Sequence, residues 1–205
     1  VPGHLYATLK AAHRHKGFSF VRILQRCPIW TPDIFQQAAQ SLELTELALG
    51  RLREHDPRLL CTVTLLEERA LARARQADRD IAAGRWRGPL HGIPIALKDN
   101  IHTTNMPTTG GALAFKDYTP PYEATLVTQL REAGAIIFAK TTLTELANWV
   151  ATGMPNSYNA VRGYGYNPYD PRPDPREGFN DGRAVLDTGG SSSGIGTAAN
   201  LWAAN

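Results

Sequence analysis

The sequence predicts an α/β fold, because short apolar strands alternate along the chain with amphipathic helices. Three short segments have the length and composition of strands, namely the alternating residues 61–65 and the apolar runs 93–97 and 135–139, which are expected to be buried. Folds of this class bind their ligands at the carboxyl ends of the strands. The chain places Lys98 and Lys140 at such ends, so we expect a functional site there.

The first strand is expected between two helices. Leucine spacing favours a helix over Ser41–His55, and the Asp-Pro pair at 56–57 should end it, because proline disfavours the helical conformation of the residue before it. Cys61–Leu65 alternates and is β-branched, which is typical of a strand. Glu67–Ala83 starts with acidic residues and is followed by Gly84, so it should form the second helix.

A second strand–helix–strand unit follows. Ile93–Leu97 and Ala135–Ala139 are predicted buried strands, and Glu123–Ala133 between them is predicted to be an amphipathic helix that stops at Gly134. The apolar residues expected to face inward from this helix are Leu126, Val127 and Leu130. Leu143–Trp149 is predicted to be a further short helix.

The two ends of the chain differ from this pattern. Residues 1–40 form a poorly defined N-terminal segment, and residues 41–205 are assigned to one domain. Tyr164–Thr188 carries four prolines, which indicates an irregular surface excursion. A glycine–serine turn at 189–194 follows, and then a predicted helix of small residues over Thr197–Ala204.

Composition argues against a nucleic-acid partner and a membrane span. The formal net charge is only +3, and many basic residues share their helices with acidic ones, as solvated helix faces do. A nucleic-acid surface would show clustered basic residues interleaved with aromatic ones. No apolar run reaches the length that crosses a bilayer.

Neither the cysteines nor the histidines predict a metal site. Cys27 and Cys61 lack metal-type spacing and are expected to be idle thiols in a reducing compartment, with the cytoplasm as the default. His4, His13 and His15 lie near one another, but no carboxylate or cysteine stands at ligand spacing beside them. We therefore expect no metal.

Lys98 is a candidate general base. Its side chain leaves the end of an apolar strand, where burial disfavours the charged ammonium form. A neutral lysine can accept a proton during catalysis. An ion pair with Asp99 or another carboxylate at the strand end is the alternative, and the sequence leaves both open. Asp99 and Asn100 are expected to fix the loop behind Lys98, and His91 is expected to be structural.

The glycine–serine turn at 189–194 allows several readings. Taken alone it could be a flexible linker or an anion-binding nest before a helix. A Walker-type loop is disfavoured because no lysine follows the glycines at the required position. A dinucleotide-binding loop is disfavoured because no strand directly precedes the turn.

Four segments in a fixed order resemble a known family. They are residues 88–100 (GPLHGIPIALKDN), residues 133–141 (AGAIIFAKT), the Asn-Pro pair at 167–168, and residues 189–194 (GGSSSG). Together they resemble the amidase signature family over residues 41–205. The resemblance implies an α/β fold with a central mixed β-sheet covered by helices on both faces, of which this chain supplies an incomplete, amino-terminal portion.

The resemblance also implies amide hydrolysis through a Ser–cis-Ser–Lys triad that needs no cofactor. Lys98 matches the base, and Ser191 matches the middle serine, which relays protons and follows a cis peptide bond. Ser192 and Ala147 are implied to support or line the substrate site. The nucleophilic serine is expected in a second glycine–serine turn beyond Asn205.

Two functional hypotheses follow from the resemblance. The first is an amidase that acts on a small-molecule amide, whose identity the sequence does not indicate. The second is a catalytically inactive amidase fragment that binds another chain, a homodimer included, through an uncovered sheet edge. An incomplete sheet should also leave apolar residues such as Leu201 and Trp202 exposed.

Overall fold

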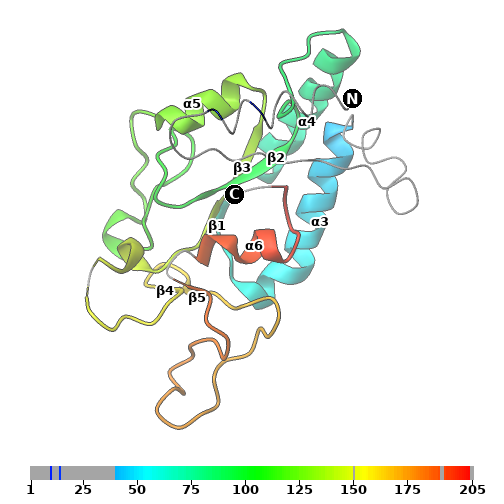
Figure 1. Ribbon diagram of the computed structural model, residues 1–205. Coiled ribbons are helices and arrows are strands. Elements are labelled where there is room, and N and C mark those ends of the chain that lie inside the picture. The colour runs from blue at the N-terminus through cyan, green and yellow to red at the C-terminus, as the bar shows by residue number, and fades with distance from the viewer. Residues whose placement is uncertain (1–9, 11–13, 15–39, 150, 190–191, 204–205) are drawn as a thin grey trace. The chain divides into compact units, whose positions relative to one another are not determined.

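The computed structural model describes residues 10, 14, 40–149, 151–189 and 192–203. The chain divides into two compact units, residues 1–34 and 35–205. The helices and strands described below all belong to the second unit (Figure 1). None of the helices in the described ranges has the length and apolar character needed to cross a membrane.

A three-stranded mixed sheet forms the centre of the second unit. Its strands are β1 (Thr62–Leu65), β2 (Pro94–Lys98) and β3 (Ile136–Thr141), in the spatial order β1-β3-β2. The central strand β3 runs antiparallel to β1 and parallel to β2. Parallel neighbours need a crossover connection, and here it contains helix α5 (Thr125–Glu132). The predicted α/β fold with a mixed sheet is confirmed.

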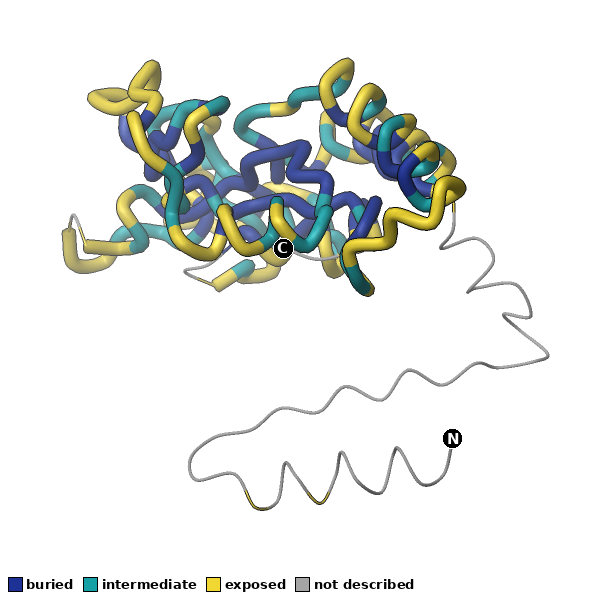
Figure 2. The backbone as a smooth tube through the Cα atoms, turned by 90° about the horizontal axis from the view of Figure 1, so that it is seen from above, coloured by how far each residue is buried: buried dark blue, intermediate teal, exposed yellow. Residues whose placement is uncertain are grey.

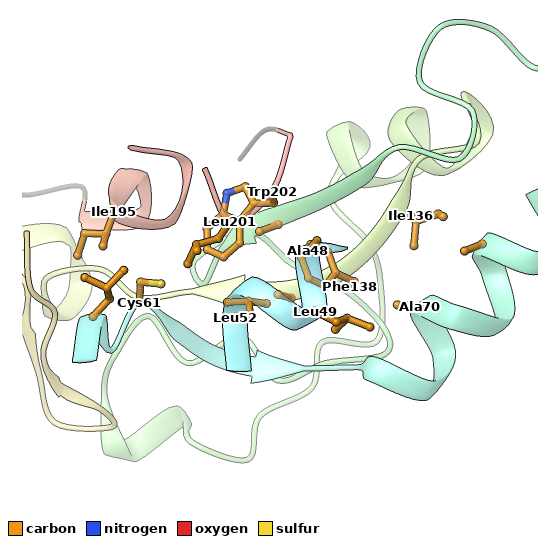
Figure 3. Packing of buried hydrophobic residues seen from close by; sticks show 14 residues of the cluster. Ala48, Leu49, Leu52, Cys61, Ala70, Ile136, Phe138, Ile195, Leu201 and Trp202 are labelled. Atoms are coloured by element: carbon orange, nitrogen blue, oxygen red, sulfur yellow. The ribbon is translucent and has the colours of Figure 1, made fainter. Parts of the chain in front are cut away.

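One face of the sheet packs against α3 (Ser41–Leu59), α4 (Glu67–Ala82) and the end of the described chain. Figure 3 shows this apolar cluster, in which the ring of Trp202 meets Phe138 of β3 edge-on at 6.3 Å between centroids. Residues of the cluster include Leu49 and Leu52 of α3, Ala70 and Ala74 of α4, Ala96 of β2, and Ile195 and Leu201.

The opposite face is covered by α5 and by the loop that follows β2. Ile95 and Leu97 of β2 and Ile137 of β3 pack there with Met106 and Val127. Because successive residues of a strand point to opposite faces, β2 and β3 contribute to both clusters. The expected cover of helices on both faces is therefore present, and Figure 2 shows the buried residues gathered between these layers.

Helix α3 runs past its predicted end. It continues through Pro57 to Leu59, so the prediction that residues 56–57 end it is wrong. A proline in the last turn removes only one intrahelical donor. The helix ends where Leu60 adopts a left-handed conformation (φ 51°) and donates its N–H to the carbonyl oxygen of Asp56 at 2.8 Å.

Helix α5 is shorter than predicted and faces differently. It begins at Thr125, with Val127 fully buried and Leu130 packed beside it, but Leu126 is 50% exposed. Residues three apart share a helix face, whereas neighbours point about 100° apart. The prediction that Leu126 faces inward is therefore wrong.

The helix predicted over Leu143–Trp149 is replaced by a distorted 3₁₀ turn, η2 (Glu145–Asn148). Leu146, Ala147 and Asn148 have positive φ values of 44°, 55° and 70°. The Leu146 N–H donates to the carbonyl oxygen of Gly110 at 2.7 Å, so a contact with a distant loop overrides the local helical tendency.

The last described segment also differs from the prediction. In place of a helix over Thr197–Ala204 it forms η3 (Ser192–Gly194) and α6 (Ile195–Ala198). Leu201 and Trp202 are buried against β3 and its helices, so the expected exposure of these two residues is wrong.

The stretch before this segment has little regular structure. A small hairpin pairs β4 (Tyr158–Asn159) with β5 (Gly163–Tyr164), and η1 (Leu113–Phe115) lies earlier in the chain. After β5 the described residues up to 189 contain only an isolated bridge between Pro173 and Ala184. The predicted irregular excursion is confirmed.

Candidate active site

Lys98 is the last residue of β2, and its side chain is half-buried. Its main chain is held on both sides, because it pairs with Thr141 of β3 and its carbonyl oxygen accepts the Ile101 N–H at 3.0 Å. Strand alternation places Lys98 on the same face as Ala96. Ala96 and Ile195 belong to one apolar cluster, and Ile195 directly follows the serine turn. The strand therefore directs Lys98 to the face of the sheet that the end of the chain covers.

Asp99 pairs with Lys140, which lies on the adjacent strand β3. The two side chains have no solvent-exposed surface, and Lys140 Nζ lies 3.4 Å from Asp99 Oδ1. Burial raises the pKa of the Asp99 carboxyl, and the Lys140 ammonium opposes that rise. Burial likewise lowers the pKa of Lys140, and the Asp99 carboxylate opposes that fall. The carboxylate that sequence analysis considered as a partner for Lys98 is thus held by another lysine.

The loop behind Lys98 is fastened to Asp99, as predicted. The Asp99 carboxylate accepts hydrogen bonds from the hydroxyl and the backbone N–H of Thr109. The main-chain carbonyl oxygen of Asp99 accepts the Gly110 N–H at 3.1 Å. Gly111 has a φ of 79°, and a Cβ there would lie 2.6 Å from that of Asn159, so a side chain would clash and the backbone would be strained. Asn100, by contrast, is exposed.

Ser191 and the peptide bond before it lie outside the described residues. The entrance to its turn is described, and there the Gly189 N–H donates to the Asp187 carboxylate at 2.8 Å. The side-chain amide of Asn167 donates to the Asp187 carbonyl oxygen at 3.1 Å, so the Asn-Pro motif at 167–168 is tied to the serine turn.

The exit of the turn is buried. Ser192 and Ser193 begin η3, and the Ser192 side chain is fully buried with no hydrogen-bond partner for its hydroxyl among the described residues. Ile195 then anchors the segment in the apolar cluster. Ala147, the other residue implied at the substrate site, is half-buried in the left-handed turn η2.

His91, expected to be structural, and Ser157 both have structural surroundings. His91 is 3% exposed, and its Nδ1 accepts the Arg87 N–H at 3.3 Å. Burial lowers the pKa of His91, and the charge of Arg87 lowers it further. Ser157 is fully buried, and its hydroxyl oxygen accepts the Gly165 N–H at 3.1 Å. Over the residues that the structure describes, no group of three His, Cys, Asp or Glu side chains could hold a metal ion.

Sequence analysis did not predict the Asp99–Lys140 pair or the role of Thr109. A signal was present, since Lys140 follows the five apolar residues of a predicted buried strand and therefore needed a buried partner. The choice of partner depends on the register between β2 and β3, in which Leu97 lies opposite Lys140.

Comparison with known proteins places the chain in a family. The family model for amidases matches residues 43–201. The chain therefore belongs to the amidase family, as the four sequence segments indicated.

Individual relatives support this assignment. AmiD of Mycobacterium tuberculosis, a predicted amidase, is 38% identical over 161 residues, which cover 78% of this chain and 30% of AmiD. A glutamyl-tRNA(Gln) amidotransferase subunit from Trichodesmium erythraeum is 44% identical over 117 residues, which cover 55% of this chain and 24% of the relative.

A solved structure is also similar. The native peptide amidase of Stenotrophomonas maltophilia superimposes with a TM-score of 0.71 at 37% identity, over 83% of this chain and 34% of the peptide amidase. The chain thus spans about a third or less of the length of these relatives.

Proposed function

We propose that this chain provides the lysine and the relay serine of an amidase that hydrolyses a carboxylic amide. The family and the peptide amidase likeness support amide hydrolysis as the reaction. Lys98 is the proposed base and Ser191 the proposed relay, with the nucleophilic serine in the part of such enzymes that the resemblance places after residue 205. The observation that carries the proposal is that β2 directs Lys98 to the sheet face on which Ile195 anchors the serine turn.

The proposed chemistry passes one proton along two hydroxyls. The neutral amine of Lys98 accepts the proton of the Ser191 hydroxyl, which accepts the proton of the nucleophilic serine. The nucleophile forms a C–O bond to the amide carbon, the C–N bond breaks, and the leaving amine takes up the proton. Water then passes a proton to the relay and bonds to the acyl carbon, the acyl C–O bond to the serine breaks, and the relay returns the proton to the serine oxygen. No cofactor takes part in these steps.

The test uses the protein as its gene encodes it. Lys98→Ala and Ser191→Ala are compared with Lys116→Ala, since Lys116 is an exposed lysine that follows η1. Ammonia or amine release is measured for a fatty amide, a C-terminally amidated peptide and an aryl amide, and a fluorophosphonate probe reports the nucleophile. Loss of a proton relay lowers the rate by roughly a hundredfold or more, so we expect that loss in the first two variants only.

Two outcomes contradict the proposal. Full turnover by the folded Lys98→Ala protein would remove that residue from the mechanism. A folded native protein that neither hydrolyses any of these amides nor reacts with the probe would instead favour a binding role.

A further inference from the structure

The pair formed by Asp99 and Lys140 is satisfied on every side by described groups. Lys140 Nζ donates to the Ile101 carbonyl oxygen at 2.7 Å and the Thr108 hydroxyl at 3.1 Å, and it lies 3.4 Å from Asp99 Oδ1. Asp99 accepts the hydroxyl and the N–H of Thr109. Lone buried charges are costly, so a pair with such complete bonding keeps both side chains in one arrangement.

The pair carries no net charge. Burial raises the pKa of Asp99 and lowers that of Lys140, which are opposite directions and both favour the neutral forms. Whether the shared proton resides on the amine or on the carboxyl, the sum of the two charges is zero. Each residue offsets the charge of the other, so the pair acts on its surroundings as a dipole and not as a net charge.

Lys98 is the group that would feel that field. It precedes Asp99 in the chain, and Lys140 precedes Thr141, the residue opposite Lys98 in the sheet. Other titratable side chains on the nearby elements have contacts of their own. The ring of His102 meets Tyr122 edge-on at 5.2 Å between centroids, Arg131 of α5 binds Glu123, and Glu145 accepts the Ala160 N–H. Glu132 ends α5 and is exposed.

We propose that Lys140 is a positioning residue for Lys98, which it serves by cancelling the charge of Asp99 and by fastening the loop behind β2. An uncompensated Asp99 carboxylate beside Lys98 would stabilise the ammonium form, which cannot accept a proton. With Lys140 opposite, Asp99 can anchor Thr109 and the loop without this effect. The inference depends on the proposed function, in which Lys98 acts as the neutral base.

Removing one charge of the pair at a time gives the test, because the two single variants leave behind charges of opposite sign. In Lys140→Met, Asp99 keeps both hydrogen bonds from Thr109 but loses the ammonium that opposes its charge, so the ionised fraction of Asp99 favours the ammonium of Lys98. In Asp99→Asn, Lys140 keeps the Ile101 and Thr108 oxygens but loses the carboxylate that opposes its charge, so the protonated fraction of Lys140 favours the neutral amine of Lys98.

The measurement is the pH profile of kcat/KM for the protein as its gene encodes it. We expect the acidic limb to move to higher pH in Lys140→Met and to lower pH in Asp99→Asn, each by about one unit. In the Asp99→Asn/Lys140→Met double variant both side chains are uncharged. The acidic limb of its pH profile should therefore return close to the native position. Thr109→Val removes a hydrogen bond without altering charge, so this control should lower the rate and leave the limb in place.

The controls separate this inference from the proposed function. Folding is checked by circular dichroism, and the double variant is compared with whichever single variant folds. If Lys98→Ala abolishes hydrolysis but the acidic limbs of the single and double variants coincide, the positioning role is wrong and the proposed function stands. If Lys98→Ala remains active, the proposed function fails first.

Discussion

Cys61 shows how one carboxylate serves several neighbours. Asp56 Oδ1 accepts the N–H groups of Cys61 and Thr62 and lies 3.1 Å from the Cys61 sulfur. Burial raises the pKa of this thiol far above its usual range, and the charge of Asp56 adds to the effect. The predicted idle thiol is confirmed for Cys61, whereas Cys27 lies outside the described residues.

This thiol should lower stability at alkaline pH. The unfolded thiol ionises above about pH 8.5, but the folded thiol keeps its proton, so the unfolded state then binds fewer protons. The free energy of unfolding therefore falls as pH rises through that range. Thermal melts of the Cys27→Ser protein, in which Cys61 is the remaining cysteine of residues 1–205, should show this fall, and additional Cys61→Ala replacement should reduce it.

Reagent access gives an independent check on the same residue. In the Cys27→Ser protein, Ellman's reagent should react with Cys61 only after denaturant is added. Rapid reaction of the native protein at pH 8 would contradict the burial of this thiol.

Two lysines show which features of single residues can be predicted from the sequence and which cannot. Lys98 was predicted as a site residue because it follows an apolar strand in a segment that resembles the family. The partner of Lys140 could not be predicted, because it depends on which strands are neighbours and in which register. Neighbouring strands are chosen by the packing of the whole domain, which leaves no local mark in the sequence.

Trp202 links the end of the described chain to the sheet. It is 4% exposed, meets Phe138 edge-on, and donates its indole N–H to the Thr197 hydroxyl at 2.8 Å. Gly196 allows this approach, since a Cβ there would lie 2.0 Å from the Trp202 ring. The segment after the serine turn is therefore held mainly by the aromatic contact of Trp202, because its helix α6 is short.

Two tryptophans provide a matched pair of substitutions. Trp202→Ala should lower the free energy of unfolding by about 3–5 kcal/mol through lost burial and the cavity it leaves. Trp149→Ala should change it by less than about 0.5 kcal/mol, since Trp149 is 89% exposed. Urea unfolding followed by circular dichroism measures both, and equal effects would contradict the packing of the chain end.

Strands were predicted more accurately than helix ends. The three predicted strands became β1, β2 and β3 with small shifts. The apolar runs of β2 and β3 have few other ways to bury both faces, whereas β1 follows its alternating, β-branched pattern. The segments that form η2 and α6 were mispredicted where distant contacts decide the backbone, such as Gly110 holding Leu146 and Phe138 holding Trp202. These contacts join residues far apart in the sequence, so local propensity could not reveal them.

For the whole molecule, the two apolar clusters share one small sheet. Ala96 and Leu97 are neighbours in β2 but belong to opposite clusters, and so do Ile136 and Ile137 in β3. Loss of either cluster removes the support of strands that the other also needs. We therefore expect residues 35–205 to unfold as one cooperative unit.

Substitutions on opposite faces test this cooperativity. Leu52→Ala and Met106→Ala each remove a nearly fully buried side chain, one from each cluster, and should each cost about 2–5 kcal/mol. Tryptophan fluorescence and far-ultraviolet circular dichroism should give coincident melting curves in both variants. Separate transitions for the two probes in the Met106→Ala protein would show that the clusters are independent.

The position of the serine turn along the chain has a consequence for biosynthesis. A ribosome delivers all three strands, by residue 141, before it delivers residues 195–202, which cover Phe138. While synthesis continues, the apolar surface around Phe138 lacks this cover and is available to chaperones. In a nascent chain the lysine strand is therefore synthesised first, and the segment after the serine turn is added to the sheet later.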